Sequence, residues 1–556
     1  MRRAILSVVL GCICLPAFAQ NAGKQSAVLN QAIDRVVNKE KENMKTFEAY
    51  TPLVETYVQT YSTDKDIGRV PNNDFYFLGR AAFKGHLQEA DFLQNTQEGL
   101  THKLLHQMEA FTITHHHMGW VPVGFAQMAV IDASAFDRQH YDFSFVRSEF
   151  LGEVRCLVFD AQPKEHSGHG RFSGRIWVED SGYNIVRFNG TYIQPKDSAS
   201  FIHFDSWRIN IGPGRWLPAY IYGEETSIKV DGHQVGLRSQ TRLWGYEASQ
   251  RKADEFTAVF VDPKDAVDQP DRAGLSPVAS ERNWQRQAED NVLDKMQHSG
   301  LLAPESDVDK LLATVVNNLI VTNDLTVEPE VRCRVMLTAP IEAFTVGHTI
   351  VLSRGLLDVL PDEASLGAVL AEQLSHIVLG HEIDTKFSFA DRVLFADDQA
   401  ISRLSMTRTA DEQIAADKKT LEIISKSPYK DALNGTGLFM KQLDDIRSTL
   451  PNLVRGKIGN ALIDSRYKLL DPVVTKSPKL DKLNVKQVAA LPLGARVAVD
   501  PWSSQVSMSK ARSVEILSAR EKMPFQITPF YPYLYRVAAE SAANSTTVTA
   551  QGGGAN

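Results

Sequence analysis

The chain has 556 residues, of which 43% are hydrophobic and 23% charged, and its formal net charge at pH 7 is −7. This length allows two to four domains, and the composition is that of a globular protein with enough apolar residues for a sizeable core. The acidic balance argues against nucleic acid as a main partner.

The N-terminus has the pattern of an export signal. Met1-Arg2-Arg3 is a basic start, Ala4 to Leu15 is an apolar run, and Ala17-Phe18-Ala19 is a small-residue cleavage site. About 12 apolar residues are too few to span a bilayer, and no later run approaches that length. We predict a signal peptide over 1–19, cleavage after Ala19, no transmembrane helix in the mature chain, and a periplasmic or secreted location. Lipidation at Cys12 is the alternative.

The spacing of apolar residues changes along the first half of the chain. Residues 25–62 have helical spacing, so we predict N-terminal helices over 20–65. From about residue 70 to 250 the spacing changes to two, in consecutive segments separated by turns. The predicted strands include Tyr141–Val146, Val154–Ala161, Arg171–Val178, Tyr183–Tyr192, Phe201–Ile209, Trp216–Tyr222 and His233–Gly245. This pattern predicts one antiparallel sheet over 66–250, curved around at least one helix.

The strand pattern resembles the LolA-like half barrel of periplasmic lipoprotein carriers. The resemblance implies an apolar concave face that could hold an acyl chain or a peptide. A core that is closed by the N-terminal helices is the alternative. His115-His116-His117 is interpreted as surface or partly buried histidines, because neighbours in a strand point to opposite faces and cannot all reach one ion.

The second half of the chain divides by composition. Residues 251–304 are predicted to be a linker with a charged helix, 305–470 a mainly helical domain, 471–539 a β or extended segment, and 540–556 a disordered tail. Cys156 and Cys333 lie in different predicted domains, and we interpret them as buried free thiols.

The most informative stretch is Leu370 to His381, in a predicted amphipathic helix that opens near Pro361-Asp362-Glu363. Glu372 and His376 are four residues apart and therefore share one face of the helix. This is the spacing of the two histidines in H-E-x-x-H, where both bind zinc and the Glu activates water. Here Glu372 holds the first ligand position and Gln373 holds the position of the general base.

The surroundings of this helix resemble the CAAX prenyl protease type 1 and HtpX-like family of gluzincin zinc metalloendopeptidases, over about residues 305–435. The matching segments are Glu342-Ala343-Phe344, His348 to Ser353, Gly355-Leu356-Leu357, Glu372 to His381, and Gln413-Ile414-Ala415-Ala416-Asp417. The resemblance implies a mainly helical zincin-like peptidase domain. With the patterns in the rest of the chain, this predicts an α+β fold: an antiparallel β half barrel with N-terminal helices, the peptidase-like domain, and a small C-terminal β segment.

Mapped onto the family, the ligand positions are Glu372, His376 and Gln413, and Asp417 is a supporting position that could accept a hydrogen bond from His376. The amide of Gln413 is a weak zinc ligand, and Gln373 has no basic site with which to deprotonate water. The resemblance also implies a peptide-binding edge strand at Thr349, Ile350, Val351 and Leu352.

These substitutions support two hypotheses. The first is an inactive metallopeptidase relative in the cell envelope that needs no cofactor and binds a protein, peptide or lipid partner. The second is an active zinc endopeptidase with altered ligands.

Overall fold

The computed structural model describes residues 15–83, 88–91, 123–132, 135–168, 170–193, 202–230, 233–246, 277–381, 406–464, 466, 468–487, 497–500, 504–508, 517–521, 525–529 and 531–537. The predictions for His115 to His117, for 251–276 and for the tail at 540–556 lie outside these residues, as does most of the apolar run of the signal. Among the described residues, no helix is both long and apolar enough to cross a bilayer.

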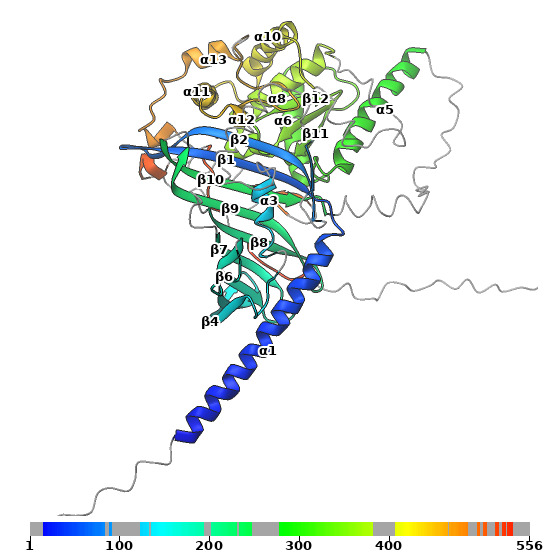
Figure 1. Cartoon of the computed structure of the whole chain (residues 1–556). Helices are drawn as coiled ribbons and strands as arrows, with labels where there is room; N and C mark the ends of the chain where they lie inside the picture. Colours follow the sequence, from blue (N-terminus) through cyan, green and yellow to red (C-terminus); the bar gives the residue numbers. More distant parts are fainter. Residues whose placement is uncertain are drawn as a thin grey trace, which may run out of the picture.

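The first part of the molecule is a single ten-stranded antiparallel sheet, which confirms the expected fold class (Figure 1). Its spatial order is β3-β2-β1-β10-β9-β8-β7-β6-β5-β4. The strands are β1 (Leu53–Asp64), β2 (Gly68–Ala82), β3 (Gln88–Asp91), β4 (Tyr141–Leu151), β5 (Val154–Pro163), β6 (Arg171–Glu179), β7 (Ile185–Ile193), β8 (His203–Gly212), β9 (Arg215–Val230) and β10 (His233–Trp244).

The prediction of a second N-terminal helix is wrong, because α1 (Leu15–Phe47) is one helix and the chain then enters β1. The first nine residues of β1 are all buried. Leu53 and Tyr57 pack into the core of the second part of the molecule, whereas Val54 and Val58 pack under the sheet's other face. A strand that is buried on both faces loses the alternation of period two, so its apolar residues imitate helical spacing.

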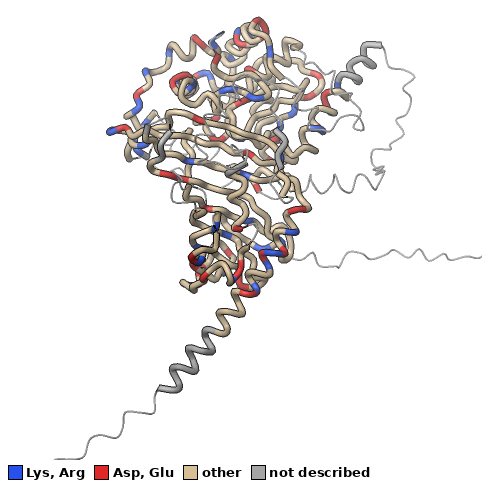
Figure 2. The backbone as a smooth tube through the Cα atoms, viewed as in Figure 1, with Lys and Arg blue, Asp and Glu red and all other residues tan. Residues whose placement is uncertain are grey.

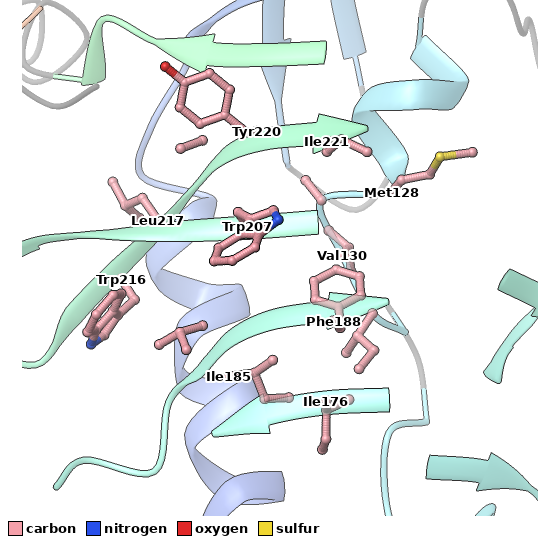
Figure 3. Close-up of a cluster of buried hydrophobic side chains, with 14 of the residues drawn as sticks. Met128, Val130, Ile176, Ile185, Phe188, Trp207, Trp216, Leu217, Tyr220 and Ile221 are labelled. Carbon is pink, nitrogen blue, oxygen red and sulfur yellow. The ribbon is translucent and has the colours of Figure 1, made fainter. Parts of the chain in front are cut away.

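The concave side of the sheet is a filled core. α1 and α3 (Val123–Gln127) pack against it, and Figure 3 shows Met128 and Val130 beside Phe188 and Ile221. Arg208 is completely buried and makes two hydrogen bonds, at 2.6 and 2.7 Å, to the carboxylate of Glu40 on α1. The alternative in which N-terminal helices close the core therefore describes this face.

The second part is mainly helical and covers the other face of β1, β2 and β10 (Figure 1). Its elements are α5 (Pro277–His298), α6 (Asp307–Thr322), β11 (Arg332–Met336), β12 (Ala343–Val346), β13 (Thr349–Ser353), α7 (Arg354–Val359), α8 (Glu363–Val378), α10 (Ala410–Lys426), α11 (Leu433–Ile446), α12 (Pro451–Val454), α13 (Asp471–Lys476), η2 (Val485–Gln487), β14 (Val497–Val499), β15 (Val506–Met508) and η4 (Ala519–Glu521). In Figure 2, acidic and basic residues are interspersed over both parts.

Buried polar contacts join the two parts. Glu55 on β1 accepts hydrogen bonds from the backbone N–H of Ala339 and from Arg242, and Arg242 also donates to the carbonyl of Leu337. Asp74 on β2 accepts from the backbone N–H groups of Asn452 and Leu453. Since buried polar groups are costly unless they are paired, these contacts fix the helical part in one position on the sheet.

The expected edge strand is not at an edge. β13, which contains Thr349, Ile350, Val351 and Leu352, is the central strand between β11 and β12, and all four residues are buried. The residue before β12, Glu342, is bridged to Ala461, and Met336 of β11 is bridged to Leu302. The peptide-binding edge predicted at Thr349–Leu352 is therefore wrong, because both neighbours of β13 are strands of the same sheet.

A further prediction holds. Cys156 and Cys333 are buried and free. The C-terminal aromatic stretch runs across the molecule: the carbonyl of Phe525 accepts from Gln59, the carbonyl of Leu534 accepts from the N–H of Glu153, and Arg536 donates to Glu179.

Candidate functional site

The predicted site helix is α8. Its N-cap Asp362 accepts a hydrogen bond from the N–H of Ser365, which satisfies one of the free donors of the first turn. All residues from Ala364 to His376 are buried, so this helix runs through the middle of the domain. Among them are Glu372, with 6% of its surface exposed, Gln373 with 4% and His376 with 1%. The three motif positions on α8 are therefore interior positions.

The facing helix is α10, which begins with a capping box between Thr409 and Glu412. The Glu412 carboxylate accepts hydrogen bonds at the helix start and is half-buried, whereas Gln413 beside it has 2% of its surface exposed. A contact between the hydroxyls of Ser375 and Thr420, at 3.0 Å, holds α8 against α10. The two helices thus bring the family's ligand positions to one interface.

Glu372 is a buried carboxyl, and no ion pair joins it to a cation within the residues that the structure describes. Burial raises the pKa of its carboxyl to about 8, and the negative charge of Asp417 adds to this shift. Asp417 accepts a hydrogen bond from the N–H of Leu470 at 2.7 Å, and burial also raises its pKa. At neutral pH Glu372 is therefore largely protonated in this environment, which removes the negative charge that a metal ligand would supply.

The expected hydrogen bond from His376 to Asp417 is not formed. Instead, Nδ1 of His376 lies 2.8 Å from Nδ1 of His381. On a continued helix these side chains would point in different directions. α8 ends at Val378, however, and Gly380 has a φ of 68°, so the chain turns back and the N–H of His381 bonds to the carbonyl of His376. This helix-ending motif places His381 beside the site.

Burial lowers the pKa of His376 to about 3, with further lowering from the positive charges of Arg408 and His381 and an opposing effect of the Gln413 amide. His376 is therefore neutral at physiological pH. Its Nε2 and the Oε1 of Gln413 are both buried, and neither makes a hydrogen bond within the described part of the chain. These two unsatisfied atoms lie at two of the three family ligand positions.

Arg408 is the neighbour that the sequence did not reveal. Its side chain has 8% of its surface exposed, and its guanidinium donates to the hydroxyl of Thr345 on β12 at 2.7 Å. Its backbone is held by Asn460, which accepts from its N–H and donates to its carbonyl. The positively charged guanidinium of Arg408 is therefore held beside β12, close enough to His376 to lower the pKa of its imidazole.

The donor set does not suit a catalytic zinc ion. The unsatisfied Nε2 of His376 is an appropriate ligand atom, but Gln413 offers only a neutral amide oxygen, and Arg408 opposes a cation at the same place. Gln373 cannot act as the base. Within the described ranges, no three His, Cys, Asp or Glu side chains are grouped so that they could hold a metal ion.

Residues 307–421 match the family model of peptidase family M48. The chain therefore contains an M48 peptidase family domain, which confirms the resemblance drawn from the motif and its surroundings. The matched residues include α8 and the first part of α10, and hence every ligand position discussed above.

Two solved structures are similar to part of the chain. A putative outer membrane lipoprotein-sorting protein domain from Vibrio parahaemolyticus is 8% identical with a TM-score of 0.21, covering 40% of this chain and 98% of that chain. A LolA superfamily protein from Nitrosomonas europaea is 12% identical with a TM-score of 0.17, covering 37% of this chain and 91% of that chain. At these scores the likenesses carry no argument about function. No curated protein matches the sequence.

Proposed function

We propose that this chain is an exported, catalytically inactive relative of the M48 zinc metallopeptidases that acts as a binding or scaffold protein of the cell envelope. One observation carries the proposal. Glu372, His376 and Gln413 keep the family's positions on two facing buried helices, while the charges needed for zinc chemistry have been replaced or neutralised. A buried polar interface of this kind stabilises a fold and leaves the reaction without its base.

The partner is a protein, peptide or lipid of the envelope. Strand addition beside β13 is not part of this proposal, because β13 is paired on both sides. Beside β12, Arg408 donates a hydrogen bond to Thr345, and Ala461 is bridged to Glu342 just before this strand.

The second candidate is an active zinc endopeptidase with altered ligands, since two ligand positions present unsatisfied buried atoms. Metal content and peptide cleavage separate the candidates. We expect purified wild type to bind no stoichiometric zinc and to leave casein intact, and we expect the variant with Glu372→His, Gln373→Glu and Gln413→Glu to bind zinc.

Each single substitution serves as a control and should stay inactive, because residues of one catalytic unit do not contribute additively. Zinc-dependent cleavage by wild type that is lost in Gln373→Ala would establish the second candidate and refute the first. Export is tested separately by N-terminal sequencing of the envelope protein, which should begin at Gln20.

A further inference from the structure

β4 is the last strand of the large sheet and pairs only with β5 within the described part of the chain (Figure 1). Its eleven residues are mostly exposed, including Phe145 with 48% and Phe150 with 66% of their surfaces exposed. A long open edge presents unpaired N–H and C=O groups and is a template for another strand. The question is which strand it fits.

The direction of the backbone groups on β4 follows from its hairpin with β5. Leu151 and Val154 flank a two-residue turn in which Gly152 has a φ of 67°. A pair that flanks such a turn exchanges hydrogen bonds, and the pattern then alternates from Leu151 to Arg147, where a β-bulge between Arg147 and Phe145 interrupts it. The backbone N–H and C=O groups of Ser148 and Phe150 are therefore directed away from β5, toward the open edge.

The side chains around Ser148 are complementary to themselves. If a second β4 pairs antiparallel with Ser148 opposite Ser148, Arg147 lies opposite Glu149 of the other copy, and this pair occurs twice. Phe150 then lies opposite Val146, again twice. Opposite charges and apolar residues directly across an antiparallel pair stabilise the pairing, and like charges destabilise it.

In this register the two charge pairs fall at positions without hydrogen bonds, where side chains across an antiparallel pair are closest. In the single chain, Arg147 and Glu149 contact each other at 2.7 Å on one face of the sheet, and Glu149 also accepts from Trp177. The two side chains thus lie on the same face of the sheet, as the symmetric pairing requires.

We propose that β4 is a self-association surface, through which two copies of this chain join their sheets antiparallel about a two-fold axis at Ser148. Closed symmetry of this kind satisfies the open edge of both copies at once. The partner is a second copy because the charge pattern Arg147-Ser148-Glu149 reverses sign about its centre, which an unrelated strand would match only by chance.

The first test uses charge reversal on the full-length protein, with oligomeric state measured by sedimentation velocity. Arg147→Glu places Glu opposite Glu twice, and Glu149→Arg places Arg opposite Arg twice, so each variant alone should associate at least about tenfold more weakly than wild type. Mixed one to one, the two variants should form a heterodimer, because both cross-strand pairs are again complementary. Lys310→Glu, whose side chain is 81% exposed on α6, is the control with the same charge change and should behave as wild type.

The second test fixes the register by disulfide formation. In the proposed pairing Ser148→Cys faces its own copy within disulfide distance, whereas Ser144→Cys, on the same exposed strand, faces Gly152. The buried Cys156 and Cys333 leave a clean background once Cys12 and Cys14 are replaced by Ser. Circular dichroism confirms folding of each variant.

We expect oxidised dimers of Ser148→Cys and none of Ser144→Cys. A wild type that remains monomeric at the highest attainable concentration overturns the proposal. Cross-linking at position 144 in preference to 148, or charge reversal that leaves a dimer intact, overturns it as well.

Discussion

Glu372→Gln tests whether the family's first ligand position holds a neutral group. The carboxyl of Glu372 has its pKa raised from an ordinary value of 4.5 to about 8 by burial and by Asp417. Between these two values the folded protein holds a proton that the unfolded chain releases. The free energy of unfolding therefore falls as pH rises from 4.5 to about 8.

The magnitude follows from about 1.4 kcal/mol per pKa unit. pH 7 lies about 2.5 pH units above 4.5, and over this interval the Glu372 carboxyl stays protonated in the folded protein alone. The free energy of unfolding is therefore lower at pH 7 than at pH 4.5 by roughly 3 kcal/mol. Gln has nearly the same shape and no proton to lose. The variant should therefore match wild type near pH 4.5 and be more stable by about 3 kcal/mol at pH 7 and about 4 kcal/mol at pH 8.

The measurement is urea unfolding of both proteins at several pH values, with Glu422→Gln on the exposed side of α10 as the matched control. The control should show no such divergence with pH. A Glu372→Gln variant that loses stability, by an amount that grows with pH, would refute the reasoning. That result would mean that the carboxylate is ionised and paired in the native protein, as a metal ligand would be.

Three other substitutions test the frame that holds the site. Arg208→Met leaves Glu40 buried without its partner and should reduce the free energy of unfolding by about 3–5 kcal/mol, most of which Glu40→Leu in the same chain should restore, as measured by urea unfolding. Glu55→Gln leaves Arg242 buried without its counter-charge and should lower the free energy of unfolding by about 3 kcal/mol. If both parts of the molecule unfold together, the tryptophan fluorescence and the far-ultraviolet circular dichroism should change at the same urea concentration. Gly174→Ala brings a Cβ to 2.2 Å from the carbonyl oxygen of Asn189 and should lower the melting temperature through about 1–3 kcal/mol of overpacking, whereas Gly236→Ala, with 3.4 Å available, should lower it much less.

The sequence located the strands from β4 to β10 but missed β1, whose first nine residues are all buried. β6 and β7 alternate and were located within one or two residues, as was the helix that carries the motif. β1 packs on two cores at once, and that burial erases the alternation from which a strand is recognised. The second core belongs to residues more than two hundred positions away, so no local pattern could announce it.

The motif positions were predictable because fixed spacing on a helix fixes the face, and Glu372 and His376 do lie together with Gln413 of the facing helix. The same helical geometry would direct His381 away from His376, but Gly380 is the residue type that ends helices and reverses the chain. Nothing in the sequence around Arg408 predicted that its side chain would lie near His376. It approaches His376 only because Asn460 holds its backbone and Thr345 receives its guanidinium, and both contacts come from distant parts of the sequence.

The burial of the site constrains where a binding function can reside. Each motif position on α8 and α10 has 6% or less of its surface exposed, so a partner could touch Glu372, His376 or Gln413 only if the chain that covers them moved. Such movement would expose a carboxyl group with a raised pKa, a neutral imidazole and two amides. None of these neutral groups would bind an approaching chain strongly. The α8–α10 interface is therefore better suited to hold the helices of the M48 domain together than to receive a ligand. Recognition by this chain should be sought on its surfaces, and changes in the former site should alter stability before they alter binding.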